Sequence, residues 1–302
     1  MDTASELSAA SADTVRAMVN QLIAGAETLA AVGLALAHRG GDVALPPEYA
    51  AGVDAVAASV LGNLDAVPPP ALATLGSFAR ALLAQSAAFS AQPTEPGAWA
   101  VSDPHVLRTL GQGSAGLAGP IAALIEAEMP ALAHRLATSE VAVLDVGTGV
   151  AALACAFARQ WSSARVVGLD VWDPALQIAA GVIASDGLGG RVSVRLQDVA
   201  MLDEPGAYDL IWFAAPFIPQ AVISVAMPRI RAALRDGGAL VFGTFDGPDP
   251  RSKALADLRT VRSGGPVLSD VEAVRLITEH GFSTVSVHRS NIGAPVRLVL
   301  AA

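Results

Sequence analysis

A buried strand that runs into a glycine-rich turn and then into a helix is the feature that most constrains this sequence. Residues 143–153 read Val-Leu-Asp-Val-Gly-Thr-Gly-Val-Ala-Ala-Leu. Glycines in such a turn adopt backbone conformations that other residues avoid, and they let a ligand come close to the main chain. The helix that follows offers free N–H groups at its first turn. The segment therefore predicts a ligand site at the end of a buried strand.

Strand-like and helical segments alternate from residue 141 onward. β-branched, apolar runs are found at residues 141–146, 165–169, 192–196, 209–213 and 239–243. Helical patterns separate most of them, at residues 150–160, 174–185 and 219–235. Two closing runs, 282–288 and 295–300, are joined by a turn-like segment, which is typical of an antiparallel pair at a sheet edge. The pattern predicts an α/β fold with a doubly wound, mostly parallel, seven-stranded sheet.

The first 100 residues have a different pattern and predict an all-helical N-terminal domain. Apolar residues recur there at helical spacing, and proline clusters at residues 46–47, 68–70 and 93–97 separate the helices. Short helices are marginal alone, so their apolar stripes must bury against the second domain, a second subunit, or both. We therefore expect residues 1–100 to form a lid or dimerisation domain and residues 101–302 to form the ligand-binding domain.

The composition of the chain limits which binding partners can be expected. The formal net charge is −9, Lys253 is the only lysine, and the arginines are scattered, so clustered cations for nucleic acid or anionic membranes are not expected. With Cys155 as the only cysteine, neither an internal disulfide nor a Cys-rich metal site can form. The start of the chain lacks a signal-peptide pattern, and charged or polar residues interrupt every long apolar run. These features predict a cytoplasmic protein without a membrane span.

The glycine spacing alone leaves two ligand classes open. Gly147, Gly149 and Ala152 also satisfy the dinucleotide-binding fingerprint. Asp145 argues for the other class, because a carboxylate at the mouth of the turn repels a pyrophosphate and attracts an ammonium group, directly or through water. S-adenosylmethionine carries that ammonium and no phosphate.

Two further acids follow strands. Asp170 ends the second predicted strand, where its carboxylate can accept from both hydroxyls of a ribose, a contact that also fits a nicotinamide cofactor. Asp198 lies just past the third strand, where it can accept from an adenine amino group.

These three acids, in this order and each at a strand end, resemble the class I S-adenosylmethionine-dependent methyltransferase family over residues 115–302. The family's first motif is an acid followed by Gly-x-Gly-x-Gly, and Ala151 replaces the third glycine here. The resemblance assigns Asp170 to the ribose and Asp198 to the adenine amino group. It implies a cofactor site formed by Asp145, Gly147, Thr148, Gly149, Asp170, Val171, Trp172, Asp198, Val199 and Ala214.

The acceptor side departs from one branch of the family. Members that methylate exocyclic amines or amides carry Asn/Asp-Pro-Pro-Tyr/Phe after the fourth strand, and this chain has Ala214-Ala215-Pro216-Phe217. Only the Pro-Phe pair remains, and we assign Pro216 and Phe217 to an apolar substrate pocket. No general base is evident, so the catalytic residues stay unassigned.

The resemblance implies methyl transfer to an oxygen, nitrogen or carbon of a small, fairly apolar metabolite, by in-line displacement. Such a transfer can proceed by alignment and desolvation of an already nucleophilic acceptor. Two alternatives remain from the residues: a nicotinamide-dependent oxidoreductase, and a protein that binds S-adenosylmethionine without methylating. We expect no metal cofactor, a small-molecule acceptor and a homodimer formed through the N-terminal helices.

Overall fold

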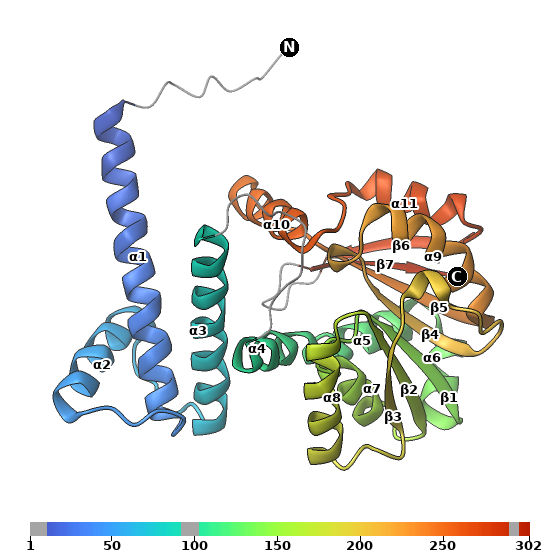
Figure 1. Cartoon of the computed structure of the whole chain (residues 1–302), viewed down its shortest axis with the longest axis horizontal. Coiled ribbons are helices and arrows are strands. Elements are labelled where there is room, and N and C mark those ends of the chain that lie inside the picture. The colour runs from blue at the N-terminus through green and yellow to red at the C-terminus, as the bar shows by residue number, and fades with distance from the viewer. Residues whose placement is uncertain (1–10, 92–102, 290–295) are drawn as a thin grey trace. The chain divides into compact units, whose positions relative to one another are not determined.

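The computed structural model describes residues 11–91, 103–289 and 296–302 (Figure 1). They belong to two compact units, one within residues 1–91 and the other within residues 92–302. Below, these are called the first and second units.

The first unit is helical, as the proline punctuation predicts. It consists of α1 (Ala12–Arg39), α2 (Pro47–Leu61) and α3 (Pro69–Ala91). Small residues bring α1 and α3 together: a side chain on Gly76 would lie 2.5 Å from the backbone nitrogen of Ala37. The core of the unit is formed by buried Val32, Ala35, Leu36, Val53, Ala57 and Leu72.

The first half of α1 is exposed along its whole circumference. Its apolar side chains recur three and four residues apart, at Val15, Met18, Val19, Leu22 and Ile23. The helix is also long and apolar enough to cross a membrane by length and composition alone, with a mean hydropathy of 1.4 over its most apolar window. A helix near the N-terminus passes this test for several reasons, so the finding is weak support for a span.

The second unit alternates strands and helices. Its helices are α4 (Pro104–Ala115), α5 (Ala118–Glu128), α6 (Pro130–Thr138), α7 (Ala152–Gln160), α8 (Asp173–Ser185), α9 (Gln220–Ala233), α10 (Pro250–Ser263) and α11 (Asp270–Glu279). Its strands are β1 (Val141–Val146), β2 (Ala164–Asp170), β3 (Val192–Leu196), β4 (Tyr208–Ala214), β5 (Leu234–Phe245), β6 (Val285–Arg289) and β7 (Val296–Ala301). Two short 3₁₀ turns, η1 (Val199–Met201) and η2 (Ala215–Phe217), follow β3 and β4.

The seven strands form one sheet in the order β3-β2-β1-β4-β5-β7-β6. β1 to β5 are parallel, and β7 runs antiparallel to both β5 and β6. The order reverses direction at β1, between β2 and β4, which is the point where α/β sheets bind ligands at the carboxyl ends of their strands. The predicted α/β class and mostly parallel sheet are confirmed.

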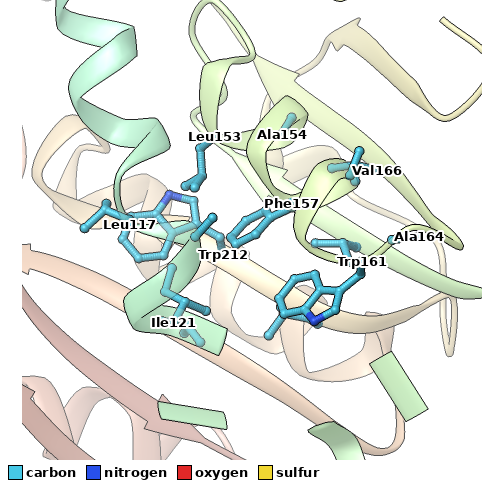
Figure 2. Packing of buried hydrophobic residues seen from close by; sticks show 14 of the residues in the cluster. Leu117, Ile121, Leu153, Ala154, Phe157, Trp161, Ala164, Val166 and Trp212 are labelled. Atoms are coloured by element: carbon cyan, nitrogen blue, oxygen red, sulfur yellow. The ribbon is translucent and has the colours of Figure 1, made fainter. Parts of the chain in front are cut away.

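Helices cover both faces of the sheet. One face packs against α5, α6, α7 and α8 through a core that contains Ile121, Phe157 and Trp212 (Figure 2). The rings of Phe157 and Trp161 stack there with their centroids 5.4 Å apart. The other face packs against α9 and α11 through Ile223, Met227 and Ile277. The strands β1, β2, β4 and β5 contribute residues to both cores, so they are held from two sides.

Two helices rather than one precede β1. The helical segment between residues 118 and 138 is broken at Met129, whose backbone is not helical (φ −132°, ψ 64°), and Pro130 starts α6. Proline has no N–H to donate and is well tolerated as the first residue of a helix, so a new helix begins there.

Candidate functional site

The turn after β1 has an unusual backbone. Gly147, Gly149 and Ala151 all have positive φ values, of 78°, 54° and 61°. The N–H groups of Gly147 and Thr148 donate to the carbonyl of Leu169 at 2.9 and 3.0 Å, which fixes the turn to the end of β2. The turn delivers the chain into α7, whose first N–H groups point toward this edge of the sheet. These residues form a cradle that a ligand can approach closely.

Asp145 is buried beneath this turn, with 1% of its surface exposed. One carboxylate oxygen accepts from the Thr148 hydroxyl at 2.7 Å, and the backbone N–H of Ala154 also donates to the carboxylate. Burial raises the pKa of the Asp145 carboxyl to about 7, and the two hydrogen bonds oppose that rise. The carboxylate thus lies under the turn rather than open at its mouth, and it can act on a ligand charge through the thin glycine backbone.

Asp170 ends β2 and contacts the same turn. Its two carboxylate oxygens accept from the N–H of Gly149 at 2.7 Å and from the N–H of Trp172 at 2.8 Å. Burial again raises the pKa of this carboxyl. The N–H of Val171 also acts on this carboxylate, and an ionised carboxylate has about four lone-pair sites, so Asp170 can still accept from a ribose hydroxyl.

The two residues after Asp170 differ in their surroundings. Val171 is 66% exposed, so its side chain is available to cover a base. Trp172 is half-buried and packs against the cluster of Leu107, Val150 and Ala175. The surface next to the Asp170 carboxylate is therefore apolar.

Asp198 and Val199 lie at the end of β3. Asp198 is half-buried and accepts from the N–H of Ala200 at 2.8 Å, so it starts the η1 turn. Val199 is buried in the same core cluster as Leu202. Of these two predicted contacts, the Asp198 carboxylate is the accessible one.

The segment after β4 closes the site from the other side. A side chain on Gly147 would lie 3.3 Å from Cβ of Ala214, so β4 ends directly against the glycine-rich turn. Pro216 is buried, and Phe217 is 37% exposed with its ring edge-on to Phe245 at 5.7 Å. The N–H of Gly265 donates to the Pro216 carbonyl at 3.1 Å, which fastens the chain after α10 onto this segment.

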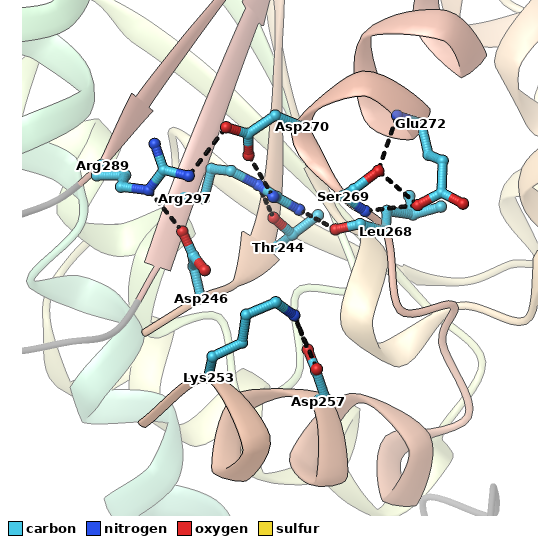
Figure 3. Close-up of polar contacts among 10 residues, drawn as sticks. All are labelled: Thr244, Asp246, Lys253, Asp257, Leu268, Ser269, Asp270, Glu272, Arg289 and Arg297. Atoms are coloured by element: carbon cyan, nitrogen blue, oxygen red, sulfur yellow. Dashed lines mark hydrogen bonds and ion pairs between the residues drawn. The ribbon is translucent and has the colours of Figure 1, made fainter. Parts of the chain in front are cut away.

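A polar network stabilises the neighbouring end of β5 (Figure 3). Arg297 is buried and donates to Thr244 at 2.9 Å and to Asp270 at 2.5 Å. Arg289 pairs with Asp246 at 2.8 Å and with Asp270 at 2.9 Å. The two arginines cross-link β5, β6, β7 and the start of α11, so they stabilise the sheet edge beside the acceptor side.

The sequence reading missed α4, which packs on the glycine-rich turn. A side chain on Gly111 would collide with Val150, and Leu107 packs directly against that residue. A start signal was present: the Asp103 carboxylate caps the helix by accepting from His105 and Val106, and Pro104 is the first helical residue. Within the described ranges, no group of three or more His, Cys, Asp or Glu side chains is arranged to hold a metal ion.

Comparison with known proteins identifies part of the chain. Residues 143–238, from β1 into β5, match the model of a methyltransferase domain family. A release factor glutamine methyltransferase of Gloeobacter violaceus is 33% identical over 134 residues, which are 43% of this chain and 46% of that protein. The chain spans about half the length of the curated relatives it matches.

Solved structures extend the likeness over both units. An O-methyltransferase family protein from Burkholderia thailandensis has a TM-score of 0.66 at 15% identity, over 97% of this chain and 98% of that chain. Human N-acetylserotonin methyltransferase, solved in complex with S-adenosylmethionine, has a TM-score of 0.60 at 14% identity, over 97% and 99% of the two chains. At these identities the likeness concerns the fold.

The family match begins at the glycine-rich turn, and the fold of the whole chain agrees with it, so the resemblance drawn from the three acids is confirmed. Residues 143–238 match a methyltransferase domain family, and they lie within a fold that the chain shares with solved methyltransferases.

Proposed function

We propose that this chain binds S-adenosylmethionine at the carboxyl edge of its sheet and transfers the methyl group to a small, fairly apolar metabolite. The observation that supports this most is a pair of carboxylates at the glycine-rich turn, Asp145, which is buried, and Asp170, which is half-buried. Neither forms an ion pair with a cation in the part of the chain that the structure describes. Buried negative charge without a cation favours a cationic ligand.

Each residue has a distinct proposed part in cofactor binding. Asp170 accepts from the ribose hydroxyls, Asp198 accepts from the adenine amino group, and Val171 covers one face of the base. Asp145 offsets the ammonium charge from beneath the turn, and the N–H groups at the start of α7 face the carboxylate end of the ligand. Gly147 and Gly149 leave room for it, because neither carries a side chain.

When bound, the cofactor supplies an electrophilic methyl group on a sulfonium. The chain's contribution is alignment and exclusion of water: Ala214, Pro216 and Phe217 offer apolar contacts where β4 ends. The acceptor's lone pair forms the new bond as the carbon–sulfur bond breaks, the bonding pair stays on sulfur, and the acceptor's proton passes to solvent. No residue is assigned as a general base.

The residues after β4 bear on the acceptor class. Three curated relatives are named release factor glutamine methyltransferases, whereas Ala214 here offers no side-chain group to hold an amide nitrogen. Ala214 and Ala215 are buried apolar residues, and Phe217 is the exposed side chain of that turn. The apolar surface formed by Ala214, Ala215 and Phe217 favours an apolar metabolite over a peptide amide as the acceptor.

The test compares ligands and then searches for the acceptor. Calorimetry should show that S-adenosylmethionine and S-adenosylhomocysteine bind, with no comparable binding of NAD. If NAD bound more tightly than either ligand, the assignment of S-adenosylmethionine would be wrong, and a nicotinamide-dependent oxidoreductase would be the better explanation. Incubation with a metabolite extract and methyl-labelled S-adenosylmethionine should then yield a labelled small molecule, and no labelled product in any extract would favour a binding protein without transferase activity.

The exposed half of α1 supports a homodimer. Five apolar side chains form one stripe there, from Val15 to Ile23, and such a stripe is stabilised by burial against a second copy. Replacing Met18 and Leu22 together by Glu should halve the mass in solution, measured by analytical ultracentrifugation. Gln21→Glu, an exposed change on the same helix outside the stripe, is the matched control. A wild-type monomer would overturn the dimer.

We also propose a cytoplasmic location, with neither nucleic acid nor membrane as a partner. The net charge of −9 argues against nucleic acid as a partner. Because α1 has the length and composition of a membrane span, the absence of a membrane partner needs a test of its own. After cell lysis and high-speed centrifugation the full chain should stay in the supernatant, and recovery in a detergent-soluble membrane pellet would contradict the proposal.

A further inference from the structure

Thr148 occupies the middle of the Gly-x-Gly turn, yet its side chain is turned inward. It is 6% exposed, and its hydroxyl donates to Asp145 at 2.7 Å. A side chain at this position can face the ligand or the sheet, and here it faces the sheet. The Thr148 hydroxyl therefore acts on Asp145 and makes no direct approach to a ligand.

The sheet contains a matching space for this side chain. Gly168 of β2 lies beside Asp145 in the strand register. A side chain on Gly168 would lie 2.5 Å from Oγ1 of Thr148 and 2.7 Å from both its Cβ and its Cγ2. The absence of a side chain at Gly168 thus allows Thr148 to fold over Asp145 and to cover it from solvent.

Among the described residues, the Thr148 hydroxyl is the side-chain group that donates a hydrogen bond to Asp145. The titratable group that acts on it is Asp170 on β2, which disfavours its ionised form, and Asp145 in turn acts on the Cys155 thiol on α7. Burial raises the pKa of Cys155 to about 11, so the thiol is neutral at ordinary pH. On β4 the paired residue is Trp212, which carries no charge.

We propose that Thr148 is a positioning residue for cofactor binding: its buried hydroxyl holds the Asp145 carboxylate in the ionised form that a cationic ligand needs. The identity of the ligand in this inference rests on the proposed function, whereas the hydrogen bond between the Thr148 hydroxyl and the Asp145 carboxylate is observed in the structure. A hydroxyl that donates to a carboxylate stabilises the charged form over the protonated one. Because burial raises the pKa of Asp145 to about 7, the loss of the Thr148 donor changes the charge of this carboxyl near neutral pH.

The test is the pH profile of S-adenosylhomocysteine affinity in Thr148→Val and Thr148→Ser. Valine keeps the shape and removes the donor, so the midpoint of the profile should rise by about one pH unit. The affinity should then fall roughly tenfold at pH 6 and by less than about twofold at pH 9. Serine keeps the donor and should match the wild type.

A second variant approaches the same contact from β2. Gly168→Ala should displace the Thr148 side chain and shift the profile in the same direction. Gly181→Ala, on α8 with no atom within 4 Å of the added side chain, is the matched control and should leave the profile unchanged. An equal loss of affinity at every pH in Thr148→Val, or no loss, would overturn the positioning role.

The pair can also be tested without ligand, which separates this inference from the proposed function. The thermal stability of the wild type should change with pH as Asp145 titrates, and Thr148→Val should move that change to higher pH. If the wild type binds no S-adenosylhomocysteine but the stability profile shifts, the proposed function fails and the hydroxyl–carboxylate coupling stands. If the stability profile does not shift, the coupling fails whatever the ligand.

Discussion

The N–H of Gly149 donates to the Asp170 carboxylate over 2.7 Å, which joins the turn after β1 to the end of β2. The acid that the family resemblance assigns to the ribose therefore also fixes the backbone that would contact the rest of the cofactor. Its second oxygen accepts from Trp172, so the start of the loop toward α8 is held by the same side chain. A change at Asp170 should affect ligand contact and turn geometry together.

Asp170→Ala should weaken S-adenosylhomocysteine binding by about 1.5–3 kcal/mol, the usual contribution of hydrogen bonds to a charged group. Calorimetry at one pH measures the difference. Asp173→Ala is the control, since Asp173 is an exposed acid three residues further along, in the first turn of α8. An unchanged dissociation constant for Asp170→Ala would remove the ribose assignment.

Asp198→Ala should cost less than Asp170→Ala in the same assay. Asp198 offers one contact to the adenine, and the base also gains from stacking on apolar neighbours such as Val171. The substitution removes the cap of η1 as well, so circular dichroism and thermal unfolding should accompany the binding measurement. A larger loss at Asp198 than at Asp170, with unfolding unchanged, would reverse the two assignments.

The sheet and the position of the ligand edge could be predicted because they depend on local patterns. The β-branched run before Gly147 and the acids at Asp170 and Asp198 are close in sequence to the strand ends they mark. Parallel strands bring their carboxyl ends to one edge, so short-range signals suffice to gather distant residues there.

Side-chain direction could not be predicted in the same way. Asp145 was expected at the mouth of the turn, and the structure places it under the turn, because Gly168 on the neighbouring strand leaves space for Thr148 to cover it. The helix α10 is likewise absent from the predicted helices, and it begins at Pro250, capped by the Asp249 carboxylate. Both features depend on contacts or caps that the periodicity of apolar residues does not show.

The pH dependence of stability should change in Asp145→Asn. The pKa of Asp145 is raised to about 7 in the folded chain, above the value of about 4 expected when unfolded. The folded state therefore binds the extra proton, and the free energy of unfolding falls as the pH rises from about 4 to about 7. Asparagine cannot ionise and keeps an acceptor for Thr148, so this fall should disappear.

Chemical denaturation of the wild type and Asp145→Asn at pH 5 and pH 8, without ligand, measures that difference. The variant should be the more stable protein at pH 8, by up to about 4 kcal/mol, and should bind S-adenosylhomocysteine more weakly. Asp186→Asn, an acid at the C-terminal end of α8, serves as a control for an acid outside the turn. A wild-type stability that rises between pH 5 and pH 8 and does so equally in Asp145→Asn would contradict the argument.

Ala151→Gly should stabilise the protein by about 1 kcal/mol. Ala151 has φ 61° and ψ 21°, a left-handed conformation that costs a side-chain-bearing residue about that much more than glycine. The family motif has glycine at this position, so cofactor binding should be unaffected. Ala156→Gly in the body of α7 is the opposite control and should destabilise by a similar amount. Equal losses in both variants would mean that the turn at Ala151 is not strained.

Removal of the first unit should separate cofactor binding from turnover. The second unit has its own hydrophobic clusters on both faces of its sheet, and the buried residues of the first unit form a separate cluster. Every proposed cofactor contact lies beyond residue 140, so a truncation that begins near Val101 should fold and retain at least weak S-adenosylhomocysteine binding.

We expect the same truncation to lose methyl transfer, because the sequence predicts that residues 1–100 form a lid or dimerisation domain. It should also lose the dimer, because the exposed apolar stripe of α1 is removed. Calorimetry, turnover with the methylated-product assay, and mass in solution measure the three properties on one sample. A folded truncation with full turnover would show that the helices of the first unit take no part in catalysis. A truncation that remains dimeric would place the subunit contact on the second unit instead.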